Sequence, residues 1–288
     1  MRSVTRLACC IVATLVGLVF LSGCDEDTVR LTFRPTVGMT STYRITVETD
    51  TTIQIGNEAP REGHDKVVLV TQHTILGPQP LGPDAKAKEK SDENVRVKVV
   101  VKESEKADRT FIVRFDRSGH PVAVESESPT NPDASGTTSL GLPEIFPAAM
   151  GAPPNRLLRS GDTWDLRRSI TLPGSAHPAD INIKGRLVEL GVVDTKDVAR
   201  VSSTATLNLQ TTRSAANGLL PAGKVQLDGT QTTYYEATHF LDNGSVRSAA
   251  STTIGDYQLL ISPPKPVGGN PASGTMKVRI ESETERID

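Results

Sequence analysis

The stretch NVRVKVVVK, residues 94–102, shows most clearly how this chain folds. Valine occupies every odd position from 95 to 101, whereas Arg96, Lys98 and Lys102 occupy even positions. Because successive side chains of a strand point to opposite faces, this alternation indicates a strand with one apolar and one polar face. Such strands are typical of antiparallel sheets that bury one face and expose the other.

The same alternation recurs along most of the chain, in residues 42–49, 109–115, 205–210 and 276–281. Turn sequences separate the strands: FDRSGHPV (115–122) contains Gly119, and FLDNGSV (240–246) contains Asn243-Gly244, a strong hairpin signal. Helical periodicity is nearly absent, and the best helix candidate, residues 143–150, is short and contains Pro147. The sequence therefore predicts an all-β protein of antiparallel sheets with very little helix.

Two pairs of glycines suggest an internal duplication. Gly38 and Gly161 each lead into a strand and lie 123 positions apart, and the turn glycines Gly119 and Gly244 lie 125 apart. Similar offsets at independent landmarks favour two duplicated curved-sheet halves over the alternative that any all-β chain has such turns. The predicted boundaries are a first β half at 31–128, a Pro/Gly/Ser-rich linker or crossover at 129–158 and a second β half at 159–288.

The N-terminus predicts export. Arg2 and Arg6 precede an uncharged, mostly apolar run from Leu7 to Leu21. The run is short for a spanning helix, which needs about 20 apolar residues, and its flanks are typical of a secretory signal. An uncleaved anchor is the alternative.

The end of this run, Leu21-Ser22-Gly23-Cys24, resembles the lipobox of bacterial lipoproteins. The resemblance implies that residues 1–23 are a signal peptide, that Cys24 carries lipid and that residues 24–30 form a lipidated tether. Asp25 at the next position is similar to the signal that retains Gram-negative lipoproteins at the inner membrane, facing the periplasm. An acidic, solvated tether is the alternative reading of Asp25. The expected location is the cell membrane, on its extracytoplasmic side.

Composition excludes several functions for the processed chain. Removal of residues 1–23 leaves 30 basic and 34 acidic residues, a net charge of −4, which argues against a nucleic-acid partner. Cys9 and Cys10 leave with the signal, and Cys24 carries the lipid. The remaining domain therefore has no thiol for a disulfide, a zinc–cysteine site or a cysteine nucleophile.

A search for catalytic or metal-binding patterns finds none at a readable spacing. The histidines lack metal-site spacing: His120 is expected to be solvated beside a turn, and His239 to be a structural, hydrogen-bonded residue. We therefore predict no enzymatic activity, no cofactor and no metal. Trp164, the single tryptophan, either anchors the core of the second half or lines a ligand groove, and the core interpretation is favoured.

In overall architecture the sequence is similar to the LolA and LppX class of curved-sheet lipid carriers, although it matches no residue-specific motif of that class. The resemblance implies a membrane-anchored module that binds a lipid or another apolar ligand, with membrane lipid as a partner through Cys24. The alternative is a structural or adaptor lipoprotein that contacts other envelope proteins and has no small-molecule ligand.

Overall fold

The computed structural model describes residues 28–77, 94–102, 108–126, 153–170, 178–215, 223–263 and 270–288. Within these ranges the chain forms strands, turns and irregular segments without a helix, so the all-β prediction is confirmed. Among these residues no helix is long and apolar enough to cross a membrane. Cys24, Asp25, the predicted helix at 143–150 and most of the predicted linker at 129–158 lie outside the described residues.

The strands are mostly long, because alternating Val, Ile, Thr and Tyr favour a half-buried pleated surface. They are β1 Val29–Arg30, β2 Thr40–Ile55, β3 Arg61–Gly77, β4 Val95–Lys102, β5 Arg109–Phe115, β6 Pro121–Ser126, β7 Leu157–Leu158, β8 Thr163–Ile170, β9 Ala179–Val193, β10 Lys196–Ala215, β11 Gly223–Phe240, β12 Val246–Ser262 and β13 Ala272–Arg286.

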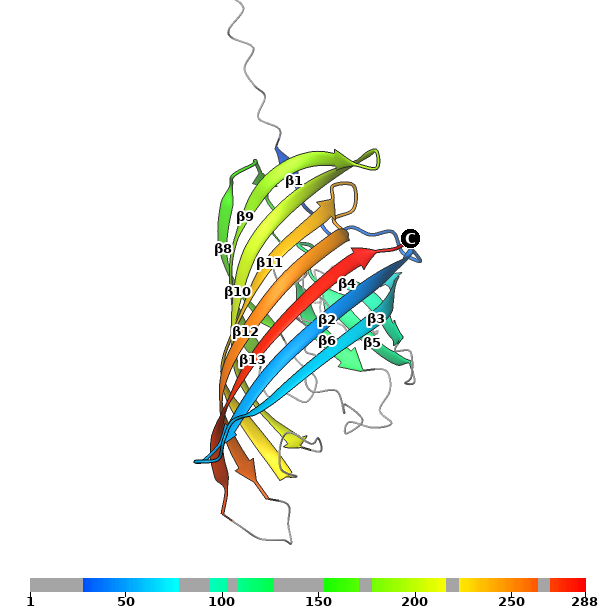
Figure 1. Ribbon diagram of the computed structural model, residues 1–288. Helices are drawn as coiled ribbons and strands as arrows, with labels where there is room; N and C mark the ends of the chain where they lie inside the picture. The colour runs from blue at the N-terminus through cyan, green and yellow to red at the C-terminus, as the bar shows by residue number, and fades with distance from the viewer. Residues whose placement is uncertain are drawn as a thin grey trace, which may run out of the picture.

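Eleven of these strands form one antiparallel sheet, in the order β6-β5-β4-β3-β2-β13-β12-β11-β10-β9-β8. Nearly all neighbours are consecutive in sequence, and the exception is β13, which pairs with β2. The end of the chain thereby joins the two halves into a single curved sheet (Figure 1). The two short strands, β1 and β7, pair with each other in a separate small sheet.

The curvature brings the two edges of the large sheet together. Strands β6 and β8 contact each other, although they are not hydrogen-bonded neighbours in the sheet. An ion pair also joins the edges, because Nη2 of Arg168 on β8 lies 3.9 Å from Oδ2 of Asp116, just after β5. The sheet is therefore a nearly closed barrel with one seam between β6 and β8.

The two halves share local structure at the predicted landmarks. Gly38 has φ 82° and Gly161 has φ 89°. Gly38 donates its N–H to the carbonyl oxygen of Ile75 on β3 at 2.9 Å, and Gly161 donates its N–H to that of Leu187 on β9 at 2.7 Å. Strands β2–β6 and β8–β12 are thus matching five-strand meanders, with β13 between them. This agrees with two duplicated curved halves built into one continuous sheet.

The predicted alternation sets which face of the sheet points inward. On β2, Tyr43, Ile45 and Val47 are buried, whereas Arg44 is exposed and Glu48 is half-buried. The same inward pattern holds for the odd positions of β4 and β12 and the even positions of the second half of β13. The apolar face therefore lines the inside of the barrel, and the charged face lies outside.

Candidate functional site

A segment near the N-terminus closes the upper end of the barrel in Figure 1. Its backbone bridges distant turns: the N–H of Phe33 donates to the carbonyl of Arg117 at 2.9 Å, and that of Arg34 donates to Asn243 at 2.9 Å. Leu31 is buried at 3% exposure and packs into the main core cluster together with Leu158 of β7. We call residues 29–38 the plug segment.

Two apolar clusters lie on the inner face. The upper cluster joins the two sides of the seam, with Val97 and Val113 from β4 and β5 and with Ile183 and Leu187 from β9. The lower cluster is built by neighbouring strands of a single wall, and its buried members are Ile53, Ile55, Val225, Leu227, Tyr257, Leu259 and Ile261. Among the described residues, those of β3–β6, β8 and β9 do not belong to this lower cluster.

Within the upper cluster, the strand registers align a row of inner-face residues, several of them small or polar. Each member lies directly opposite the next on the neighbouring strand. From β8 to β2 the row consists of Trp164, Gly185, Ser203, Tyr235, Ser251, Ser282 and Val47. We call it the polar row. Its polar members are all buried, from 2% exposure at Tyr235 and Ser282 to 8% at Ser251.

Several polar atoms at this level have no hydrogen-bond partner among the described residues. They are Nε1 of Trp164, Oγ of Ser203 and Oγ of Ser282, together with Oγ1 of Thr284 in the next row. Buried polar groups are usually paired, and each one left without a partner costs about 1–3 kcal/mol. Burial also raises the pKa of Tyr235 well above its ordinary value, so the phenol stays protonated.

The large aromatic rings of the inner wall lie against glycine. A Cβ atom on Gly185 would lie 2.3 Å from Cε2 of Trp164, and one on Gly255 would lie 2.6 Å from Cε2 of Tyr257. The hydroxyl of Tyr257 reaches the neighbouring strand β11 and donates to Oε1 of Gln231 at 3.0 Å. Because only glycine leaves this space, both rings rest flat on the wall and project less into the barrel.

The surroundings of His73 and His239 are those of structural residues. Burial lowers the pKa of His73 to about 3; its ring lies 4.7 Å from that of Tyr43, centroid to centroid, and its Nε2 lies 3.1 Å from Oγ1 of Thr71. His239 is buried, and its Nδ1 lies 3.2 Å from the carbonyl oxygen of Gly244, as predicted for a structural histidine. Burial lowers its pKa as well.

The prediction of a solvated His120 is wrong. This residue follows the turn glycine but is only 2% exposed. The turn is not free in solvent, because Phe33 of the plug segment bonds to Arg117 within it. Asp116 further fixes the turn by accepting the N–H of Ser118 at 2.8 Å and that of His120 at 3.0 Å.

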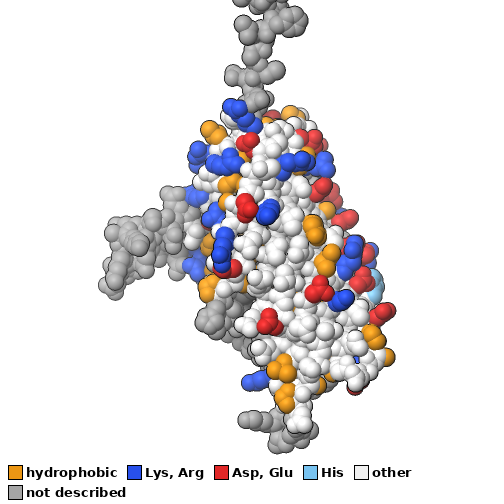
Figure 2. Space-filling view, turned by 90° about the vertical axis from the view of Figure 1, so that its left-hand side faces the viewer, with side chains coloured by type: hydrophobic (Ala, Val, Ile, Leu, Met, Phe, Trp, Pro, Cys, Tyr) orange, Lys and Arg blue, Asp and Glu red, His pale blue; other side chains and the backbone are white. Residues whose placement is uncertain are grey.

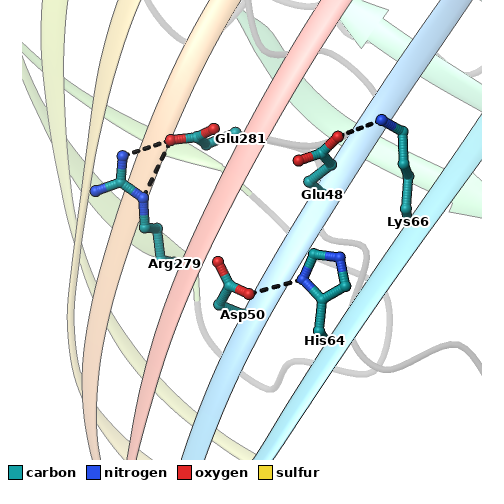
Figure 3. Close-up of polar contacts among 6 residues, drawn as sticks. All are labelled: Glu48, Asp50, His64, Lys66, Arg279 and Glu281. Atoms are coloured by element: carbon teal, nitrogen blue, oxygen red, sulfur yellow. Dashed lines mark hydrogen bonds and ion pairs between the residues drawn. The ribbon is translucent and has the colours of Figure 1, made fainter.

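The outer face is polar and carries charges of both signs. Figure 2 shows Lys, Arg, Asp and Glu scattered among small uncharged side chains, with hydrophobic side chains singly or in small groups. On β2 and β3, Lys66 pairs with Glu48, and Nδ1 of His64 lies 2.8 Å from Oδ1 of Asp50 (Figure 3). The four side chains are 39–63% exposed, so such pairs stabilise the fold little.

One shallow hollow of about 480 Å³ lies on this outer face. Arg44, Arg200, Glu236, Glu283 and Glu285 contribute its charged side chains, and Ser248 and Ala250 lie between them. Arg200 is already paired within it, at 3.0 Å from Glu236. The hollow is therefore suited to a polar contact surface rather than to an apolar ligand.

The structure places the predicted site residues as follows. Trp164 is 6% exposed and belongs to the upper cluster, where the favoured core interpretation places it. Cys24 and Asp25 remain predictions. No group of His, Cys, Asp and Glu in the described ranges is arranged to hold a metal ion. Asp194 and Thr195 form the turn between β9 and β10.

Sequence reasoning did not find the polar row. Its members come from seven different strands, and only the pairing registers bring them side by side. Comparison of the sequence with known protein families returned no match, and comparison with curated proteins returned none either.

Proposed function

We propose that this chain is a membrane-anchored binding protein that holds an apolar ligand inside its curved sheet. The observation that carries the proposal is an apolar inner wall formed by a nearly closed sheet of 11 strands. A barrel of about eight strands is just filled by its own side chains, and the diameter grows with strand number. By this scaling, a barrel of 11 strands is wider than one that its own side chains just fill.

The inner side chains near the middle of the wall are short. Along β12 the inward positions are Ala249, Ser251, Thr253 and Gly255, and the rings of Trp164 and Tyr257 lie flat. From Ser251 to Leu259 of the lower cluster the strand runs about 26 Å. An extended acyl chain spans about half of a ~30 Å hydrocarbon layer, so this wall is long enough for one.

The lipobox resemblance supplies the anchor in this proposal. Lipid on Cys24 would hold the protein at the membrane, because two or more acyl chains anchor stably. Only Asp25–Thr28 separate Cys24 from β1, a reach of about 14 Å. The plugged end of the barrel would then face the bilayer, and the lower cluster would point away from it.

Mass spectrometry of co-purified lipid tests the proposal. The Cys24→Ser variant, exported with an ordinary secretory signal, gives a soluble protein without its own acyl chains. We expect organic extracts of this protein to contain a bound lipid at near-equimolar amounts. Extracts without lipid, together with no binding of an apolar fluorescent dye, would contradict the proposal.

The outer hollow favours a second candidate, an adaptor that contacts other envelope proteins. Its mixed charges around Arg44 and Glu283 resemble the polar rim of protein interfaces more than a ligand pocket. Cross-linking on intact cells, compared between the wild type and Arg44→Ala/Glu283→Ala, tests this candidate. Loss of a specific cross-linked neighbour in the variant would favour the adaptor, and unchanged cross-links would reject it.

A further inference from the structure

We propose that the plugged end of the barrel, the upper end in Figure 1, carries a surface that binds the headgroups of anionic phospholipids. This inference rests on the anchor in the proposed function, because lipid on Cys24 would bring this end to the bilayer. It starts from the small sheet at that end, in which Arg30 of β1 lies directly opposite Leu157 of β7.

The small sheet turns one pair of side chains inward and the other outward. Leu158 is fully buried, and its partner Val29 packs against the upper cluster. Arg30 is exposed, and Leu157 is 55% exposed. The sheet therefore presents a cation beside an apolar side chain at the surface of the protein.

Exposed apolar side chains are concentrated at the plugged end. Among the described residues, nine large hydrophobic side chains are exposed, and the three most exposed are Val192 at 66%, Val37 at 62% and Leu157 at 55%. All three lie at this end, as do Leu76 near the end of β3 and Ile287 just after β13. Single exposed hydrophobic residues are normal, whereas their concentration at one end indicates a contact surface.

Backbone hydrogen bonds hold these elements together at the plugged end. The N–H of Ile287 donates to the carbonyl of Thr42 near the start of β2 at 2.9 Å. The N–H of Leu241, in the β11–β12 turn, donates to the carbonyl of Asp197 near the start of β10 at 3.0 Å. The plug segment is bonded to the same β11–β12 turn and to the end of β3. The exposed apolar residues are thus carried by neighbouring elements.

The same end carries two cations without a counter-charge. Residues 28–39 contain Arg30 and Arg34 and no acidic residue. Both arginines are exposed, and neither forms an ion pair with a described residue. Three other arginines of this end are paired, Arg156 at 3.7 Å from Asp162, Arg247 at 3.0 Å from Asp194 and Arg286 at 2.6 Å from Asp288. The positive charges of the plug segment therefore stay available to a partner.

This combination is complementary to the surface of an anionic bilayer. Each Lys or Arg near such a surface strengthens binding by a factor of about five, and neighbouring apolar side chains can enter the boundary between headgroups and acyl chains. The tether of about 14 Å keeps the small sheet, which follows it directly, close to the bilayer. The contact is local, because the processed chain has a net charge of −4 and Asp197 and Asp242 are exposed near the same end.

Co-flotation with lipid vesicles tests the inference on the Cys24→Ser protein, which has no acyl chain of its own. The vesicles consist of phosphatidylcholine alone or of equimolar phosphatidylcholine and phosphatidylglycerol. We expect binding to the anionic vesicles that weakens as the salt concentration rises, and much weaker binding to phosphatidylcholine. No binding to the anionic vesicles, or equal binding to both kinds, would overturn the inference. The proposed function has a separate readout, the lipid co-purified with the same protein, so the two can fail independently.

Charge variants locate the surface. Arg30→Ala/Arg34→Ala should weaken binding to the anionic vesicles by about 10- to 30-fold. The matched control is Lys224→Ala/Lys277→Ala, which removes two exposed cations from the first halves of β11 and β13, far from the plugged end, and should leave binding unchanged. Equal losses in the two double variants would mean that overall charge attracts the membrane, and would overturn the inference.

Apolar variants test whether the surface enters the bilayer. Val37→Ser/Leu157→Ser should weaken binding to the anionic vesicles several-fold. The matched control is Ile254→Ser/Leu260→Ser, since both side chains are 42% exposed and lie farther along β12. All four side chains are exposed, so these variants should fold normally. Wild-type binding by Val37→Ser/Leu157→Ser, or an equal loss in the control, would contradict this contact surface.

Discussion

Trp164 lies directly on Gly185: a Cβ atom added to this glycine would come within 2.3 Å of the indole ring. The two residues are cross-strand partners on β8 and β9. The contact explains how the single tryptophan of the chain can be 6% exposed and still lie flat on the inner wall. The ring of Tyr257 lies against Gly255 in the same way.

The Gly185→Ala substitution should lift the indole off the wall. We expect a loss of stability of about 1–3 kcal/mol, typical of overpacking, and a change in the fluorescence of Trp164. Gly191→Ala on the same strand is the matched control, because nothing lies within 4 Å of its added Cβ. If the two variants unfold at the same denaturant concentration, the contact with Trp164 is not a packing constraint.

The plug segment is expected to be part of the cooperative core. Leu31→Ala should lower the free energy of unfolding by about 2–4 kcal/mol, because it empties a buried site in the upper cluster. Val37 belongs to the same segment but is 62% exposed. Val37→Ala should therefore change the free energy of unfolding by less than about 0.5 kcal/mol. Chemical denaturation of both variants measures the difference. Equal, small effects would mean that the plug segment is not packed into the barrel.

Stability should fall as pH falls below about 6.5, in part through histidines whose pKa the fold lowers. The pKa of His73 is about 3 in the fold, so the folded state keeps this imidazole neutral while the unfolded chain takes up a proton. By linkage, its contribution is retained above the unfolded pKa and is lost progressively toward pH 3.

Denaturant unfolding of His73→Gln at several pH values tests this dependence. The variant cannot titrate at this position, so its stability should depend less steeply on pH than that of the wild type between pH 6.5 and 4. Parallel curves for the two proteins would contradict a neutral His73 in the folded state.

The seam should be the part of the wall that opens most readily. Asp116 holds the turn between β5 and β6 and pairs with Arg168 across the seam at 3.9 Å. Asp116→Ala should therefore speed hydrogen exchange of backbone amides in β6 and β8, with little change in β12. Asp194→Ala is the control, since it removes another aspartate–arginine pair at the exposed β9–β10 turn. Uniform acceleration across the sheet in Asp116→Ala would mean general destabilisation instead.

The sequence alone predicted the faces of the strands, because alternation depends only on neighbouring positions. Val95, Val97, Val99 and Val101 share one face, as expected from the opening stretch, and the last three are buried inside the barrel. The two turns with Gly119 and Gly244 also fall where predicted.

Closure, the seam and the polar row could not be predicted in this way. They depend on long-range pairing, above all on β13 meeting β2, and on registers that align Ser203 with Tyr235 and Ser251 with Ser282. The burial of His120 was missed for the same reason, since a segment far away in the sequence packs on its turn.

Trp164 permits the most direct test of a ligand inside the barrel. A diacylglycerol with brominated acyl chains quenches tryptophan only on close contact, so it should quench Trp164 to saturation at an equimolar ratio in the lipid-extracted protein. A reporter that combines Trp164→Phe with Tyr234→Trp places the indole on the outer face, where Tyr234 is 51% exposed, and should not be quenched. Unquenched Trp164, or equal quenching of both reporters, would contradict an interior binding site.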